Sequence, residues 1–141
     1  MKYVVYYGFN KYNKNGGPKM VWDMLSTAEE RGYQPFCLYN VDGIHISIKG
    51  IICGIINAFK LFFLLNKGDI VLLQFPLNRT LMHFVYIFIR AKKALSITMI
   101  HDVDYLRNIP LRNKGVEGMK KNEIYLLNQS DYIIAPNNLM I

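Results

Sequence analysis

The feature that most constrains this chain is a regular alternation of strand-like and helix-like segments. Residues 69–75 form a largely apolar run between Gly68 and Pro76, which is typical of a strand covered on both faces. Residues 95–100 are predicted to form another buried strand. Successive parallel strands need crossover connections, most often helices, and helical periodicity indeed fills the intervals between the apolar runs.

The expected strands cover residues 2–7, 34–39, 69–75, 95–100 and 132–135, and the expected helices cover residues 18–31, 51–65, 80–93 and 116–128. This order predicts an α/β fold. We expect a Rossmann-like, three-layer α/β/α domain with a mostly parallel sheet of about five or more strands.

Length and composition are consistent with one globular domain. The chain has 141 residues, of which 52% are hydrophobic and 19% charged, and domains commonly contain roughly 100–200 residues. The formal net charge is +7, which favours anionic partners. No arginine-rich arm or recognition-helix signature accompanies it, so we expect no nucleic acid. The cysteines, Cys37 and Cys53, fall on apolar segments, which predicts buried thiols.

The most hydrophobic segment is residues 51–65, with twelve apolar residues of 15. A membrane-spanning helix needs about 20, so we expect a buried or half-buried helix. A membrane-surface helix is the alternative, with Lys49, Lys60 and Lys67 near anionic headgroups. The first eight residues lack the features of a signal peptide, which favours a cytoplasmic protein.

Ligands of open parallel sheets bind beyond the carboxyl ends of the strands. After the first expected strand comes a glycine- and lysine-rich loop ending in Gly16, Gly17 and Lys19. Glycines allow close approach of a ligand, and the following helix N-terminus favours an anion. Such a loop is otherwise simply a flexible connection.

Polar residues also follow the two apolar strands. His101 and Asp102 come directly after residues 95–100, with Arg107 further on. His101 is suited to bind a sugar hydroxyl or act as a base, Asp102 to orient it, and Arg107 to pair with phosphate. The structural alternative is that His101 and Asp102 cap the strand end.

Gln74 and Asn78 lie at the end of the preceding apolar strand. They are candidates either for binding a substrate at this edge of the sheet or for hydrogen bonds within the loop. The dinucleotide fingerprint GxGxxG, the P-loop and the GxSxG elbow are absent from the sequence, which excludes the enzyme classes that depend on them. We expect no bound metal and no cofactor.

Four stretches together resemble one family: Gly16–Lys19, Gly68–Pro76, Ile100–Arg107 and Ser130–Met140. They are similar to the N-terminal domain of GT-B glycosyltransferases, in particular the bacterial glucosyltransferase 3-like and β-1,6-galactofuranosyltransferase-like group. The His-Asp-x-x-x-Leu-Arg loop carries most of this resemblance. Pro136 departs from the group, which often has histidine there.

The resemblance implies a domain, residues 1–141, that forms the acceptor-side half of a glycosyltransferase. A C-terminal domain outside this chain would bind most of the nucleotide-sugar donor, so this part alone is expected to be inactive. The implied acceptor is a glycan, glycoprotein or lipid-linked sugar.

By the same resemblance, His101 and Asp102 face the transferred sugar, Gly16 and Gly17 lie near the donor diphosphate or acceptor, and Arg107 binds an anion. The positive net charge and the apolar segment 51–65 also fit peripheral association with the inner face of the cell membrane, as the resemblance implies. A non-enzymatic, flavodoxin-like module that binds an anionic ligand or a protein remains the alternative, and a homo-oligomer is left open.

Overall fold

The computed structural model describes residues 1–9, 16–41, 46–101 and 115–135, and it confirms the α/β architecture. The order of elements is β1 (Lys2–Phe9), α1 (Gly16–Glu30), β2 (Gln34–Val41), α2 (Ile48–Leu64), β3 (Ile70–Phe75), α3 (Arg79–Ala91), β4 (Leu95–Ile100), α4 (Gly115–Leu127) and β5 (Tyr132–Ile134). Each expected element is present, with bounds that differ from the expected ones by at most three residues at either end.

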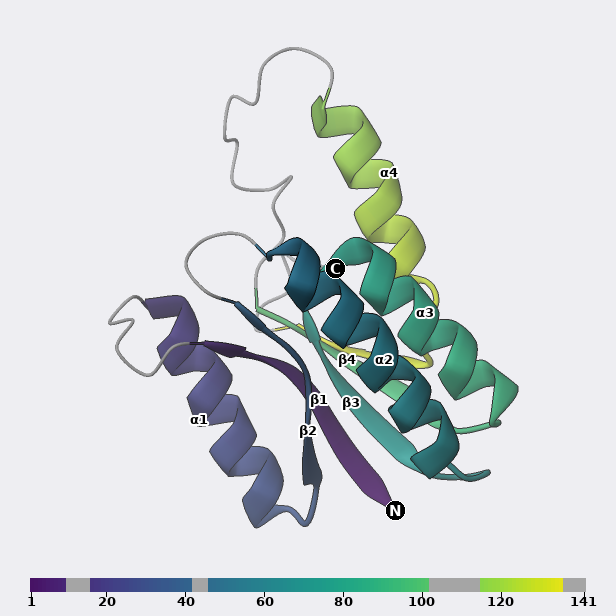
Figure 1. The fold of residues 1–141 in the computed structure, drawn as a ribbon. Helices are drawn as coiled ribbons and strands as arrows, with labels where there is room; N and C mark the ends of the chain where they lie inside the picture. Colours follow the sequence, from purple (N-terminus) through teal and green to yellow (C-terminus); the bar gives the residue numbers. More distant parts are fainter. Residues whose placement is uncertain (10–15, 42–45, 102–114, 136–141) are drawn as a thin grey trace.

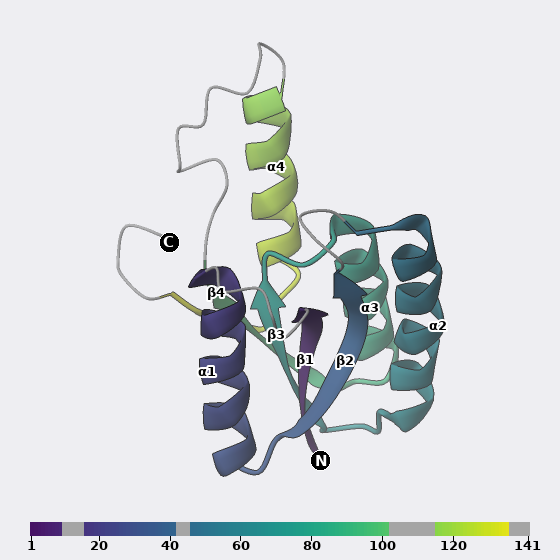
Figure 2. The ribbon, with the colours of Figure 1, turned by 60° about the vertical axis from the view of Figure 1, so that its left-hand side comes forward.

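The five strands of the described part form one sheet in the order β2-β1-β3-β4-β5, and every neighbouring pair is parallel. α1 lies on one face of the sheet, and α2 and α3 lie side by side on the other (Figures 1 and 2). The fold is therefore a Rossmann-like, three-layer α/β domain.

β3 lies at the centre of the sheet and is covered on both faces, as its sequence predicts. Val71 and Leu73 are fully buried in the larger apolar core, which they share with α2 and α3. Leu72, on the opposite face, packs in a smaller core with Met24 of α1 and Val4 of β1. Because successive side chains of β3 point to opposite faces of the sheet, this strand packs against α1 on one face and against α2 and α3 on the other.

Polar side chains attach the short strand β5 to β4, with the exposed Asp131 and the half-buried Ser130 reaching the buried Ser96 and Thr98. The Asp131 carboxylate accepts hydrogen bonds of 2.7 Å from both the backbone N–H and the hydroxyl of Ser96. The Ser130 hydroxyl donates to Thr98 Oγ1 at 2.9 Å, and Tyr86 Oη lies 2.7 Å from the same atom. Burial raises the pKa of Tyr86 to about 12, so its hydroxyl remains protonated in this network.

α2 is half-buried, as expected. Its inner face contains the buried residues Gly54, Ala58 and Leu61. Cys53 lies on its outer face and is exposed, while Cys37 is half-buried, so the prediction of a buried thiol is wrong for Cys53. The cause is that α2 is apolar on both faces, so that sequence alone does not show which face is covered. Within the described ranges, no helix has the length and apolar character needed to cross a bilayer.

Gly54 sets the close approach of α2 to α3, and this generates a prediction. A Cβ atom at Gly54 would lie 2.4 Å from Leu81 Cδ1 and 3.3 Å from its Cγ, and Leu81 is fully buried. Gly54→Ala should lower the free energy of unfolding by about 1–3 kcal/mol, because the added methyl overpacks this contact. Urea denaturation measures the change.

Gly118→Ala on α4 is the matched control, since nothing lies within 4 Å of its added Cβ. There the alanine should stabilise by about 0.5–1 kcal/mol through its helix propensity. If Gly54→Ala were also stabilising, the proposed packing of α2 on α3 would be incorrect.

Candidate functional site

The main candidate site is a groove between α1 and the open face of the sheet. Its volume is about 510 Å3, and apolar side chains from α1, β3, β4 and β5 line most of it. These are Met20, Met24, Leu72, Met99 and Ile134. His101 lines one end, together with Met20.

The strand order explains why this groove exists. α1 returns the chain from β1 to the edge strand β2, whereas the next two crossovers pass over the opposite face. In the described part of the chain, α1 is the only helix seen against its own face of the sheet (Figure 2). The α1 side of β4 and β5 is consequently open beside it.

His101 follows the carboxyl end of β4, where the sequence predicts the site. Its backbone N–H donates to the carbonyl oxygen of Phe75 at 2.9 Å, which extends the β3–β4 ladder by one residue. The side chain is half-buried, and its Nε2 atom has no hydrogen-bond partner among the described residues. Burial lowers the pKa of His101, because desolvation disfavours the charged ring, so the imidazole is held in its neutral form.

Gln74 lies on the same face of the sheet, because it alternates with Leu72 along β3. Its side chain is fully buried under α1, and Nε2 lies 3.5 Å from the Val21 carbonyl oxygen and 3.5 Å from Met24 Sδ. Oε1 has no hydrogen-bond partner in the described ranges. The structure therefore places Gln74 beneath the groove rather than at its rim.

Asn78 has a clear local function. Its side-chain oxygen accepts a hydrogen bond from the Leu81 N–H at 3.3 Å and so caps α3. Its own N–H donates to Tyr39 Oη at 2.9 Å. Burial raises the pKa of Tyr39 to about 12, which keeps that phenol protonated. A role of Asn78 in binding an acceptor stays a prediction.

The first turns of α1 adjoin the His101 end of the groove. Gly16 and Gly17 begin the helix, Lys19 is exposed, and Met20 shares the groove end with His101. The structure thus brings this end of α1 beside His101, as the rule for parallel sheets predicts. Asp102 and Arg107 lie outside the described residues.

Sequence reasoning missed the methionine lining of the groove. Met20 and Met24 recur at helical spacing and read as ordinary core positions, yet both line the open groove, as does Met99 of β4. A signal was available, because flexible thioether side chains are common at adaptable binding surfaces. Among the described residues, no three His, Cys, Asp or Glu side chains gather as a metal site would require.

A second hollow, of about 330 Å3, lies between α3 and α4 and is lined by His83, Arg79 and Tyr125, among others. It occupies the opposite face of the sheet and contains none of the predicted site residues. The groove beside α1 is therefore the stronger candidate.

The fold and the position of the groove define a Rossmann-like domain with its candidate site at the carboxyl edge of a parallel sheet. Over residues 2–141 the sequence matches the family described as glucosyltransferase 3-like, N-terminal domain. The chain belongs to this family, which confirms the resemblance carried by the sequence motifs. No curated protein matches the chain.

The half-buried, neutral His101 predicts a pH dependence of stability. Because its folded-state pKa is lowered, the unfolded chain takes up this proton more readily. The free energy of unfolding is therefore at its full value above about pH 6.5, the pKa of histidine in the unfolded chain. It falls as the pH drops through that value towards the lower pKa of His101 in the folded protein.

His101→Gln removes this titration while keeping a polar side chain. Between about pH 7.5 and about pH 5.5 the unfolding free energy should fall more steeply for the wild type than for His101→Gln. Urea denaturation across this range measures the difference, from which the other two histidines cancel because both proteins contain them. Parallel curves would show that the fold does not lower the pKa of His101.

Proposed function

We propose that this chain is the acceptor-side domain of a GT-B glycosyltransferase. The complete enzyme would transfer a sugar from a nucleotide-sugar to a glycan, glycoprotein or lipid-linked acceptor. The observation that carries this proposal is the family match over residues 2–141, combined with a groove that ends at the carboxyl edge of the sheet beside His101. The donor nucleotide would bind mainly to a second Rossmann-like domain of the enzyme.

In this proposal the neutral imidazole of His101 binds or deprotonates a hydroxyl group of the sugar or acceptor. Burial keeps the ring in its neutral form, and its unpartnered Nε2 can then accept a hydrogen bond or a proton from the hydroxyl. Asp102 would orient His101 or accept a second hydroxyl. Gln74 would support the floor of the site, and its unpartnered Oε1 atom could accept from a ligand or a water.

The positive charge at the N-terminus of α1, which adjoins the His101 end of the groove, supports a phosphorylated ligand there. The N-terminus of α1 carries Gly16, Gly17 and Lys19, and helix N-termini favour anions through their free N–H groups and dipole. We assign these three residues to the donor diphosphate or to an anionic acceptor. Arg107 would pair with the same anion, and Asn78 would contact the acceptor at the end of β3.

The strand order favours one second candidate. The order β2-β1-β3-β4-β5 is the flavodoxin-like arrangement, in which ligands also bind where the order reverses, between β1 and β3. A non-enzymatic module of this kind would bind an anionic ligand or a protein through the same loops. Sugar transfer by the enzyme containing this domain decides between the two candidates.

Substitution of His101 or Asp102 tests the proposed site. In an enzyme that carries this domain together with its donor-binding domain, His101→Ala should lower kcat by about 100-fold or more, as expected when a general base is lost. Asp102→Ala should act in the same direction. Turnover is measured with a soluble acceptor, and circular dichroism verifies the fold.

His83→Ala is the matched control, because His83 lies in the hollow on the opposite face of the sheet. It should leave kcat within about two-fold, as expected of a position away from the reacting groups. Equal losses in His83→Ala and His101→Ala would contradict the assignment of the site.

The proposed division of labour between domains gives a further prediction. Calorimetric titration of this 141-residue chain with UDP-sugars should show no tight, saturable binding, because most contacts to the nucleotide would come from the other domain. Saturable binding of the donor by this chain alone would require the donor site to be reassigned to the groove.

We also propose that the protein is cytoplasmic and associates peripherally with the inner face of the cell membrane. Both the net charge of +7 and the apolar segment of α2 support this location. Lipid-linked acceptors would then be within reach of the domain.

A further inference from the structure

The outer face of α2 exposes large apolar side chains along its whole length. Ile48 is 79% exposed and Phe63 is 77% exposed, near the two ends of the helix, and Ile52, Ile56 and Phe59 between them are each about half exposed. These five residues recur every three or four positions, so they form a single stripe. The helix has 17 residues and is about 25 Å long at 1.5 Å per residue.

Packing of the fold does not account for this stripe. The opposite face of α2 already supplies Ala58, Leu61 and Gly54 to the core and to the contact with α3. A surface helix of a soluble domain usually has polar residues on its outer face. α2 instead has a second apolar face, and contiguous apolar surface of this kind marks an interaction site.

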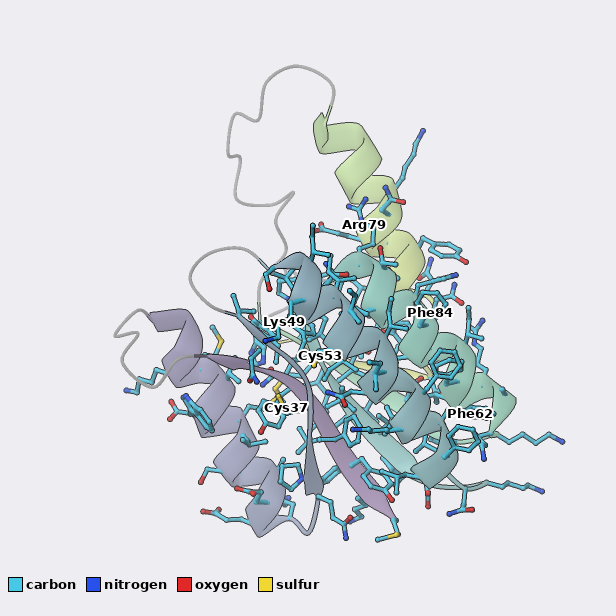
Figure 3. The ribbon with its side chains drawn as sticks, in the orientation of Figure 1. Cys37, Lys49, Cys53, Phe62, Arg79 and Phe84 are labelled. Atoms are coloured by element: carbon cyan, nitrogen blue, oxygen red, sulfur yellow. The ribbon has the colours of Figure 1, made fainter. Side chains whose placement is uncertain are left out.

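The apolar surface continues from α2 onto α3. The ring of Phe88 lies 5.1 Å from that of Phe59 and 5.2 Å from that of Phe62, measured between centroids. The ring centroid of Phe84 lies 6.4 Å from that of Phe88, and Ile87, also on α3, is 46% exposed. In Figure 3, Phe62 lies near the C-terminal end of α2 and Phe84 lies further along the α2–α3 layer on α3. We call this surface of α2 and α3 the outer apolar face.

The part of the chain that contains the outer apolar face is rich in basic residues and nearly free of acidic ones. Residues 43–101 include seven Lys and Arg but a single acidic residue, Asp69, which is buried. Lys49 and Lys60 are exposed on α2 beside the apolar stripe. Lys92 places its Nζ atom 4.6 Å from the centre of the Phe62 ring. Most of the net charge of +7 therefore belongs to this part of the chain.

These observations favour a bilayer surface over a second copy of the chain. A two-fold contact would place the same surface against itself, so that its basic residues would face one another. Neither α2 nor α3 contains an acidic residue to pair with them, and like-charge contacts oppose association. An anionic bilayer satisfies both properties, since apolar side chains enter the acyl region while lysines remain at the headgroups.

We propose that the outer apolar face docks on an anionic phospholipid bilayer, with α2 lying parallel to the membrane plane. Ile48, Ile52, Phe59 and Phe63 enter the interface, and Lys49 and Lys60 contact lipid phosphates. The inference names the surface and the lipid class behind the peripheral location proposed above, and it does not depend on sugar transfer. α2 begins at the carboxyl edge of the sheet, where the groove also ends, so docking would bring that edge close to the membrane.

Vesicle co-sedimentation of the 141-residue chain tests this docking. The chain should bind vesicles that contain phosphatidylglycerol and bind weakly to vesicles of phosphatidylcholine alone. Ile48→Ser combined with Phe63→Ser should weaken binding at least about ten-fold, because two inserted apolar side chains are lost. Lys60→Gln should weaken binding about five-fold through loss of one charge near the surface.

Two matched controls lie away from the outer apolar face. Tyr132→Ser removes an aromatic side chain that is 62% exposed on β5, and Lys2→Gln removes a lysine that contacts Tyr33, a residue packed against the α1-side core. Both variants should bind phosphatidylglycerol vesicles like the wild type. Binding that is insensitive to the double substitution, or absent in the wild type, would overturn the proposal.

Fluorescence quenching tests the orientation without disrupting the fold. The chain contains a single tryptophan, Trp22, which lies on α1 at the opposite face of the sheet. Lipids brominated on their acyl chains should quench a tryptophan introduced by Phe63→Trp but leave Trp22 of the wild type unquenched. Quenching of Trp22 alone would overturn the proposed orientation.

Analytical ultracentrifugation tests whether a second copy of the chain, rather than lipid, covers the outer apolar face. A wild-type dimer that becomes monomeric on Ile48→Ser and Phe63→Ser would assign the outer apolar face to a second copy and overturn the lipid proposal. A wild-type monomer agrees with docking on lipid. Transfer to a soluble acceptor is measured separately, so failure of docking is distinguishable from failure of the proposed enzymatic function.

Discussion

The burial of β3 on both faces is the constraint on which the rest of the structure depends. Val71 and Leu73 face α2 and α3, while Leu72 faces α1, and each is removed almost entirely from water. Full burial of one such side chain contributes about 1.5–3 kcal/mol. A strand with this pattern is stable only between two helical layers, and those layers come from the crossovers that join its parallel neighbours.

The order of the strands then makes the two faces of the sheet unlike. One crossover, α1, covers β1 and β2 on its side and leaves the groove over β4 and β5. The crossovers α2 and α3 fill the other side and present their outer faces to solvent. The candidate ligand site and the outer apolar face are thus on opposite sides of one sheet. A bilayer at α2 would therefore leave the groove beside α1 open to solvent.

The sequence predicted the fold well because its information is local and repeated. Strands buried on both faces read as apolar runs, and turns such as Asn66–Gly68 mark where helices stop. The location of His101 followed from a general rule of parallel sheets. The exposure of Cys53 did not follow, because a helix that is apolar all round does not reveal its covered face. Nor could spacing show that Asn78 caps α3 or that Gln74 is buried under α1. Asp102 and Arg107 lie outside the described residues.

Two unpartnered polar atoms, one at the His101 end of the groove and one beneath it, separate a ligand site from a mere gap in the core. A buried hydrogen-bonding group without a partner costs about 1–3 kcal/mol, and an apolar side chain at either position would avoid that cost. Among the described residues, both Gln74 Oε1 and His101 Nε2 lack a partner, and both residues lie on the α1 side of neighbouring strands. Most of the remaining lining is apolar and adaptable, with Met20, Met24 and Met99, and Asp23, Thr27 and Arg31 of α1 add polar groups along the helix. An apolar groove with a few polar groups is the usual composition of a small-molecule site, and a sugar presents both the hydroxyl groups and the apolar ring face that such a groove can bind.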